Sequence, residues 1–349
     1  TAPSSNGGDG SSGKNEPMQH SSPPSTREAA RPPMWKVWLL ASRPHTLTAS
    51  IAPVLVGHTC TAATSITPGN TSLLRMTTIS WLLFCVLIQL GTNLHNDYAD
   101  FVMGADTCKR VGQARATQKG WLSPQQTCAG STLTLTLALA IGLQVIFEHG
   151  MTDPVLWFII LSSIFNAVAY TGGPFPLGYI GMSNVSIAYS GLGDVFCFVY
   201  FGLVATLVIP YLSAYTGDFV SSCQELKPFF GPALQVGFLA TAIIVVNNLR
   251  DRHTIVDANK RTVAVRFGGT FCRVEYTLLI VLSFAIVVNQ YIQSNSNSRR
   301  LLPLLSLPLA VTEIKSIWIK DGADLNPHVG GTARLQLAFC ILLSFGMML

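Results

Sequence analysis

Apolar and polar stretches alternate along this chain from Trp35 to its last residue. Nine apolar stretches approach the roughly 20 residues that a helix needs to cross the hydrocarbon core of a bilayer. They cover residues 45–66, 73–96, 125–147, 153–171, 189–211, 229–248, 272–292, 301–319 and 332–349. The first is the weakest, because it is rich in Thr and Ala and contains Pro53. The pattern predicts an all-α, multi-pass membrane protein with about nine transmembrane helices.

Composition supports an integral membrane location. Hydrophobic residues make up 49% of the chain and charged residues only 11%, far below the roughly 25% of a soluble globular protein. Residues 1–33 differ, since Ser, Gly, Pro and Asn dominate them without any hydrophobic period. Such a stretch cannot bury enough apolar surface to offset the entropy lost on ordering. We therefore predict a disordered tail over 1–33 and a transmembrane domain over 34–349.

The start of the chain also bears on its location. It has neither an initial Met nor the apolar core of a secretory signal. A transit peptide that has been removed would explain both features, and a cloning boundary would explain them equally well.

The basic residues predict the orientation in the membrane, because Lys and Arg accumulate on the side that is not translocated. With nine spans, the N-terminus and the loops after spans 2, 4, 6 and 8 share one face. That face holds 18 of the 22 Lys and Arg residues, and the opposite face holds only Arg75, Lys227, Arg299 and Arg300. The formal net charge of +5 is therefore explained by topology and by attraction for anions, and it does not indicate a nucleic-acid partner.

A charged cluster, "NLHNDYADFVMGADTCKRVGQARATQKGWLS", follows the second span at residues 93–123. If the helix continues to about Phe101, then Asn93, Asn96, Asp97 and Asp100 fall at offsets of 0, 3, 4 and 7 and share one face. Polar groups at this depth are costly in a membrane and usually functional.

The same cluster contains a turn and a basic half. Gly104 allows the chain to turn, so that Asp106 can return toward the other carboxylates. Such closely spaced carboxylates need a cation between them, and oxygen ligands without Cys or His suit Mg²⁺. Cations beside a magnesium site are what a diphosphate requires. The basic residues that follow are Lys109, Arg110, Arg115 and Lys119.

A second cluster repeats this pattern on the same predicted face. The string "NNLRDRHTIVDANKRTVAVRFGG" spans 247–269, and in it an Asn-rich helix end leads to Asp251 and Asp257. The basic residues Lys260, Arg261 and Arg266 follow. Two acidic helix ends could hold Mg²⁺ ions that grip a diphosphate from both sides. A solvated, charged helix cap is the alternative for either cluster, but that explanation requires the same coincidence twice.

The two motifs "NDYADFVMGAD" (96–106) and "NNLRDRHTIVD" (247–257) resemble those of the UbiA superfamily of intramembrane prenyltransferases. Further strings resemble its MenA-type branch, the 1,4-dihydroxy-2-naphthoate polyprenyltransferases. These strings are "SRPHTLTASIAPVLVG" (42–57), "YTGGPFPLGYIG" (170–181) and "GLGD" (191–194). The similarity extends from about Arg43 to Arg266, and "GGTARLQLAFCILL" (330–343) is a weaker match.

The resemblance implies a bundle of transmembrane helices around a central cavity, and it implies roles for particular residues. It gives Asp100, Asp106, Asp251 and Asp257 as catalytic. It gives as metal ligands Asn96, Asp97, Asp100, Asp106, Asn247, Asp251 and Asp257. It gives as substrate-binding Arg43, Lys109, Arg110, Arg115, Tyr170, Asp194, Lys260 and Arg261, of which Tyr170 and Asp194 would face the aromatic substrate.

The implied reaction is Mg²⁺-dependent transfer of a polyprenyl or phytyl group from its diphosphate to 1,4-dihydroxy-2-naphthoate, with decarboxylation, in menaquinone or phylloquinone biosynthesis. A relative that uses 4-hydroxybenzoate or homogentisate is one alternative, and an ion-coupled transporter is another. A transporter is disfavoured, because its acidic residues are expected near the middle of spans. The polar tail and a quinone product favour a plastid membrane, with a bacterial inner membrane as the alternative.

Two departures from the family pattern stand out. The chain carries an additional segment, "MSNVSIAYS", at 182–190, and it has Asn259 where the family commonly has Gly. Asn tolerates a left-handed backbone, so we expect the second turn to persist. The added segment lies near the expected aromatic site, and its role is open.

Overall fold

The structure is a computed structural model, and it describes residues 31–64, 71–106, 111–149, 151–173, 186–215, 219–256 and 260–348. Nearly all of the predicted tail, residues 1–30, lies outside these ranges. Residues Pro33–Leu349 form one unit by their internal contacts, and the description below concerns that unit.

The elements in the described ranges are all helical, which confirms the all-α prediction. The α-helices are α1 (Met34–Ser42), α2 (Thr48–Ala62), α3 (Thr71–Val102), α4 (Pro124–His149), α5 (Pro154–Gly172), α6 (Ile187–Ser190), α7 (Gly193–Cys197), α8 (Ala205–Ala214), α9 (Phe219–Glu225), α10 (Phe230–Asp251), α11 (Val263–Gln293), α12 (Leu307–Ile319) and α13 (Asn326–Met348). Short 3₁₀ segments cover Pro44–Thr46, Lys227–Phe229, Ser298–Ser306 and Gly322–Leu325.

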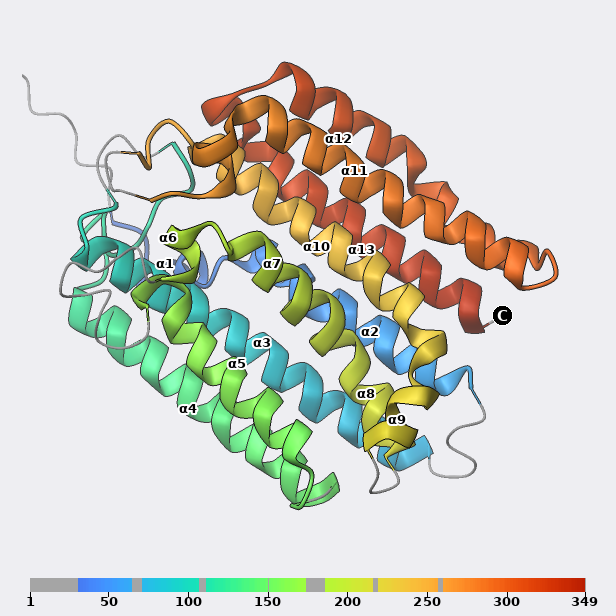
Figure 1. Cartoon of the computed structure of the whole chain (residues 1–349). Helices are drawn as coiled ribbons and strands as arrows, with labels where there is room; N and C mark the ends of the chain where they lie inside the picture. The colour runs from blue at the N-terminus through green and yellow to red at the C-terminus, as the bar shows by residue number, and fades with distance from the viewer. Residues whose placement is uncertain are drawn as a thin grey trace, which may run out of the picture. The chain divides into compact units, whose positions relative to one another are not determined.

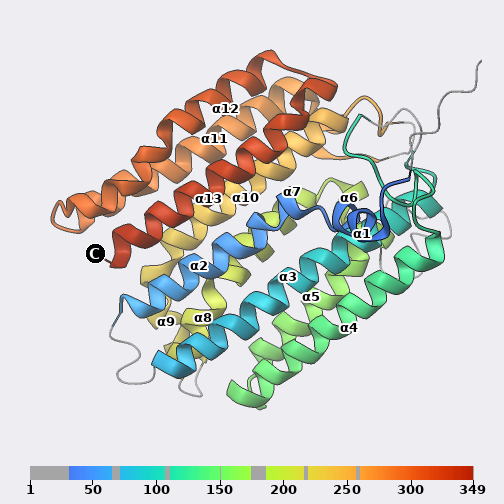
Figure 2. The ribbon, with the colours of Figure 1, turned by 180° about the vertical axis from the view of Figure 1, so that it is seen from behind.

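The number of membrane crossings is close to the prediction. Within the described ranges, eight helical segments are long and apolar enough to cross a bilayer. The one predicted span missing from these eight is the first, at 45–66, which corresponds to α2, a helix of only 15 residues that contains Pro53. At 1.5 Å per residue, α2 is about 22 Å long. It lies among the longer helices, between α3 and α13 (Figure 2).

The fifth span is not a uniform α-helix. Between α7 and α8 the residues Phe198–Val204 form a π-helix, a rare conformation that is often found at functional sites. At this point the chain packs against α10 so closely that a Cβ on Gly202 would lie 2.4 Å from the Cα of Gly237. The predicted span at 189–211 is thus present, but its π-helical turn was not predicted.

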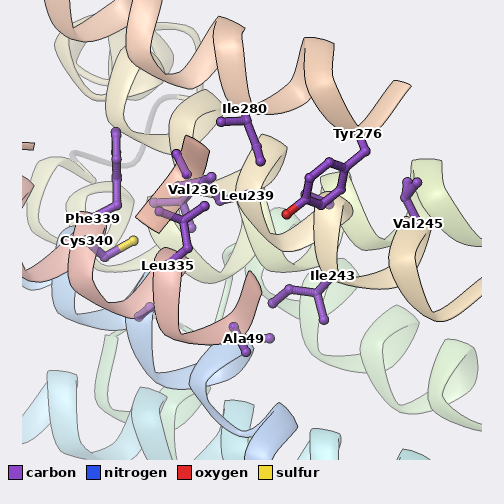
Figure 3. Close-up of a cluster of buried hydrophobic side chains, with 14 of the residues drawn as sticks. Ala49, Val236, Leu239, Ile243, Val245, Tyr276, Ile280, Leu335, Phe339 and Cys340 are labelled. Atoms are coloured by element: carbon purple, nitrogen blue, oxygen red, sulfur yellow. The ribbon is translucent and has the colours of Figure 1, made fainter. Parts of the chain in front are cut away.

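Helix α10 is the most buried of the spans and organises the larger apolar core. Figure 3 shows Val236, Leu239 and Ile243 of this helix beside side chains of α11 and α13. From α11 comes Tyr276, whose hydroxyl lies 3.0 Å from the hydroxyl of Thr332 and so satisfies a buried polar group. Because loss of such fully buried side chains would leave destabilising cavities, the packing of this core holds α10 in position.

Both acidic motifs lie at the same end of the helices. Figures 1 and 2 place α1, α6 and the connections α3–α4 and α10–α11 at this end, and α9 and the C-terminus at the other. We call the first end the motif end. Its arrangement agrees with the common face predicted from the Lys and Arg residues, and Arg75, Arg299 and Arg300 lie in segments at the opposite end.

Candidate active site

The first acidic motif is built by the end of α3 and the turn after it. The helix continues to Val102, one residue past the predicted end. Gly104 then takes a left-handed backbone, with φ of 72°. The N–H groups of Ala105 and Asp106 donate to the carbonyl of Asp100 at 2.8 and 3.2 Å. The turn therefore returns Asp106 to the level of Asp100, as the sequence predicted.

Basic side chains from two separate loops meet at Asp100. The guanidinium of Arg115 lies 3.1 Å from Asp100 Oδ2 and 3.6 Å from Asp106 Oδ2. From the loop after α10, Lys260 Nζ lies 3.5 Å from Asp100 Oδ1. Asp100 is only 2% exposed. Since a buried charge requires a partner, the two loops are tied together electrostatically at this carboxylate.

A polar pocket of about 70 Å³ lies beside these groups. Its polar lining comprises Arg43, Asn96, Asp100, Arg115, Tyr170, Thr171, Asp194, Asn247, Asn248, Lys260 and Thr262. Several of them are held by neighbours within the pocket wall. The Thr171 hydroxyl donates to Asn96 Oδ1, and Asn248 Nδ2 donates to Asp194 Oδ1 at 3.2 Å.

A larger apolar hollow of about 210 Å³ extends from the polar pocket toward the other end of the helices. Trp81, Phe84 and Phe201 are among the side chains that line it. Five residues line both spaces and form a throat between them: Arg43, Asn96, Tyr170, Ile244 and Asn247. The site therefore consists of a charged, polar pocket and an adjacent apolar hollow that share part of their walls.

The second acidic motif contributes differently from the first. At the end of α10, Arg250 donates to both carboxylate oxygens of Asp251 at 2.7 Å and to Asn247 Oδ1 at 2.8 Å. Just beyond, the Arg252 guanidinium donates to both carboxylate oxygens of Asp321. These hydrogen bonds lower the pKa of Asp321 below its ordinary value. The loop is thereby fastened to the segment that precedes α13.

The structure brings eight of the predicted site residues into the polar pocket: Arg43, Asn96, Asp100, Arg115, Tyr170, Asp194, Asn247 and Lys260. Four others do not line it: Asp97, Asp106, Asp251 and Arg261. Three lie outside the described residues: Lys109, Arg110 and Asp257.

The four residues outside the pocket wall have defined surroundings. Asp97 is 1% exposed, and its carboxylate accepts from the Thr117 N–H at 3.4 Å. Asp106 faces Arg115, and Asp251 is held by Arg250. The side chain of Arg261 is exposed, although its N–H donates to the Tyr189 carbonyl. Their predicted roles therefore stay predictions.

Two neighbours of the site were not predicted from the sequence. Asn248 holds Asp194, and Tyr189 donates from its hydroxyl to Asp100 Oδ1 at 3.0 Å. The sequence could have indicated Asn248, because it is the second of two Asn residues at a helix end inside a membrane span. Nothing in the sequence pointed to Tyr189, since it belongs to the added segment and carries no charge.

The donor chemistry of the polar pocket fits a hard divalent cation. Its carboxylate and amide oxygens come from Asp100, Asp194, Asn96, Asn247 and Asn248, and no Cys or His lines it. Such hard oxygen donors are the ligand type that Mg²⁺ prefers. Within the part of the chain that the structure describes, no group of three or more His, Cys, Asp and Glu residues is close enough to hold a metal ion. Asn donors and bound phosphate oxygens would therefore have to complete the coordination.

Fold and site together define a class of protein: a multi-pass helical membrane protein with a charged pocket at one end of an apolar hollow. Comparison with known proteins identifies the family. Residues 50–326 match the UbiA prenyltransferase family, and the chain belongs to this family.

Two curated relatives support the MenA-type resemblance. The 1,4-dihydroxy-2-naphthoate octaprenyltransferase of Escherichia coli K12 is 30% identical over 319 residues, which cover 90% of this chain and 96% of that protein. The protein of the same name from Mycobacterium leprae is 30% identical over 305 residues, with coverage of 87% and 93%.

A solved structure supports the fold. The apo structure of a UbiA homologue from Aeropyrum pernix K1 superimposes with a TM-score of 0.60 at 9% identity and covers 88% of this chain and 98% of that one. The predicted UbiA-like fold is therefore confirmed.

Proposed function

We propose that this protein transfers a prenyl group from its diphosphate to 1,4-dihydroxy-2-naphthoate, with loss of the acceptor's carboxylate as CO₂, in a Mg²⁺-dependent reaction of menaquinone or phylloquinone synthesis. The acceptor is suggested by the names of the bacterial relatives. The observation that carries the proposal is the throat, where the charged pocket and the apolar hollow share Arg43, Asn96 and Tyr170. A prenyl diphosphate has the same division into a charged head and an apolar tail.

The basic residues of the pocket bind the leaving group. Arg115, Lys260 and Arg43 are placed to neutralise the diphosphate as the allylic C–O bond breaks and its electron pair leaves with the phosphate oxygen. When bound, Mg²⁺ supplies further positive charge to that oxygen. We assign its retention to Asn96, Asp100 and Asn247, whose oxygens line the pocket. Of the other predicted ligands, Asp97, Asp106 and Asp251 lie outside the pocket wall and Asp257 lies outside the described residues.

The hollow protects the allylic cation. Its lining is mainly apolar, so little water is available to capture the cation before the acceptor does. The ring carbon of the acceptor that bears the carboxylate attacks the cation and forms the new C–C bond. The bond to the carboxylate then breaks, CO₂ departs, and its electron pair restores the aromatic ring. Tyr170 and Asp194, at the wall of the throat and pocket, are assigned to the acceptor side.

The biological setting is part of the proposal. An apolar prenylated product remains in the bilayer, which agrees with a site built inside membrane helices. Of the locations open to an integral membrane protein of this kind, we favour a plastid membrane.

The decisive experiment supplies purified protein with 1,4-dihydroxy-2-naphthoate, 4-hydroxybenzoate or homogentisate, each with geranylgeranyl, phytyl or octaprenyl diphosphate. We expect a prenylated and decarboxylated naphthoquinol, identified by mass and dependent on added Mg²⁺. Turnover of another acceptor without turnover of the naphthoate would refute the assignment. Product formation at full rate in excess chelator would refute the metal dependence.

A further inference from the structure

A tyrosine behind the polar pocket contacts the first acidic motif and the basic segment that follows the second. Tyr189 lies in α6, at the end of the segment 182–190 that departs from the family pattern. Its side chain is 1% exposed and does not line the pocket, whereas its neighbour Ala188 does. It therefore cannot touch a substrate in the pocket, and any effect on the reaction must pass through other residues.

Its first contact is to the first motif. The Tyr189 hydroxyl donates to Asp100 Oδ1 at 3.0 Å, while Arg115 binds the other oxygen, Oδ2, at 3.1 Å. The two donors approach opposite oxygens of one buried carboxylate, so together they restrict its rotation about χ2. Hydrogen bonds to charged groups are among the stronger ones in proteins.

Its other contacts are to the loop of the second motif. Lys260 Nζ lies 4.8 Å from the centre of the Tyr189 ring, within the range of a cation–π interaction. The main-chain N–H of Arg261 donates to the Tyr189 carbonyl at 3.1 Å. One residue thus joins a ligand candidate on α3 to the basic loop after α10.

We infer that Tyr189 is a positioning residue of the donor site, which orients the Asp100 carboxylate through its hydroxyl and holds the Lys260 loop through its ring and main chain. The inference rests on the proposed function, and it gives the added segment 182–190 a role in the binding of metal and diphosphate. Groups that orient metal ligands typically change metal affinity or activity by about 10-fold to 100-fold when they are removed.

The test compares two Tyr→Phe variants of the full chain. Tyr189→Phe removes the hydroxyl and keeps the ring near Lys260. Tyr276→Phe is the matched control, because it also removes a buried, hydrogen-bonded hydroxyl, but from the apolar core. Three quantities are measured for each: the Mg²⁺ concentration for half-maximal activity, the rise in unfolding temperature on addition of Mg²⁺ with inorganic pyrophosphate, and the KM for the acceptor.

For Tyr189→Phe we expect the half-maximal Mg²⁺ concentration to increase about tenfold, with a smaller pyrophosphate-induced rise in unfolding temperature and an unchanged KM for the acceptor. Tyr276→Phe should leave all three at the wild-type values. A purely structural Tyr189 would lower the unfolding temperature without ligand and leave the Mg²⁺ requirement unchanged. That result would overturn the inference.

A second comparison covers the case in which Tyr189→Phe folds poorly. Tyr189→His retains a ring and a hydrogen-bond donor, whereas Tyr189→Leu retains neither. We expect a larger pyrophosphate-induced stabilisation for the His variant, and equal values would contradict the positioning role. Failure of the wild type to prenylate the naphthoate would count against the proposed function alone, because the thermal measurement needs no acceptor.

Discussion

At the scale of single residues, the helical period places Asp97 and Asp100 in one acidic cluster, but the folded chain separates their surroundings. Asp100 lines the polar pocket and is bound by Arg115, Lys260 and Tyr189. The Asp97 carboxylate faces the main chain at Thr117, and its Oδ1 has no hydrogen-bond partner among the described residues. Two neighbouring carboxylates therefore face different partners.

This difference predicts unequal effects of two matched substitutions. We expect Asp100→Asn to lower kcat by about 100-fold or more, because the pocket loses a charge that faces the metal and diphosphate. Asp97→Asn keeps an oxygen that accepts from Thr117, so kcat should fall by less than about tenfold. Both are assayed at saturating Mg²⁺ in membranes that contain equal amounts of inserted protein. Equal losses for both variants would make Asp97 a direct ligand.

Much of the site could be predicted from the sequence, because charged and amide side chains are rare inside membrane spans and so identify themselves. Asn96, Asp100 and Asn247 were found in this way, Lys260 was found in the basic cluster that follows the second motif, and all four line the pocket. The orientation of Asp97 could not be predicted, since it depends on the loop at Thr117, which is packed by tertiary contacts. The role that we infer for Tyr189 could not be predicted for the same reason, because it depends on which residues Tyr189 contacts in the folded chain.

At the scale of elements, the sequence located most of the long helices closely but missed the irregular ones. The span predicted at 125–147 is α4, Pro124–His149, and that at 229–248 matches α10, Phe230–Asp251. The exception is α11, which begins at Val263, well before the predicted start at 272. By contrast, the π-helix Phe198–Val204 has no local signal, because an apolar run is compatible with α and π geometry alike. Close packing against α10 accompanies it.

The π-helix forms part of the wall of the apolar hollow, through Tyr200, Phe201 and Val204. Asn166 of α5, which also lines the hollow, donates to the Tyr200 hydroxyl at 2.5 Å and so connects this wall to α5. The shape of the hollow therefore depends on how closely the π-helix approaches α10.

Two substitutions of glycine by alanine, at Gly202 and at Gly330, test this dependence. Gly202→Ala would place a methyl group 2.4 Å from Gly237 Cα, so the π-helix must shift; we expect a loss of about 1–3 kcal/mol in stability and a lower kcat/KM for the prenyl donor. Gly330→Ala is the control, since nothing lies within 4 Å of the added Cβ, and it should be neutral or slightly stabilising. Thermal unfolding in detergent and donor kinetics provide the readouts, and wild-type values for Gly202→Ala would contradict this account of the wall.

At the scale of the whole molecule, the two spaces follow one another along the helices, with the polar pocket at the end that carries the acidic motifs. Along α3, the hollow is lined from Asn96 at the throat to Trp81 at its deepest point. This interval corresponds to about 22 Å at 1.5 Å per residue. An extended isoprene unit spans about 5 Å by ordinary bond lengths, so the hollow accommodates about four units before the chain reaches Trp81.

Trp81 lies at the end of the hollow that is far from the throat, and its side chain is held in place by its neighbours. It is fully buried, its ring stacks on Phe84 with centroids 5.0 Å apart, and its Nε1–H donates to the Ala205 carbonyl at 3.0 Å. The side chain is thus fixed to both α3 and α8. We predict that it limits the length of the donor tail that fits straight into the hollow.

Replacement of Trp81 by Leu should therefore change donor preference. We expect the ratio of kcat/KM for octaprenyl diphosphate to that for geranylgeranyl diphosphate to rise at least about fivefold, because the longer tail gains space beyond the fourth unit. Trp157→Leu is the matched control, since its indole also donates to a main-chain carbonyl, that of Met151, but does not line the hollow. An unchanged ratio in a Trp81→Leu protein that folds and turns over the shorter donor would show that long tails leave the hollow by another route.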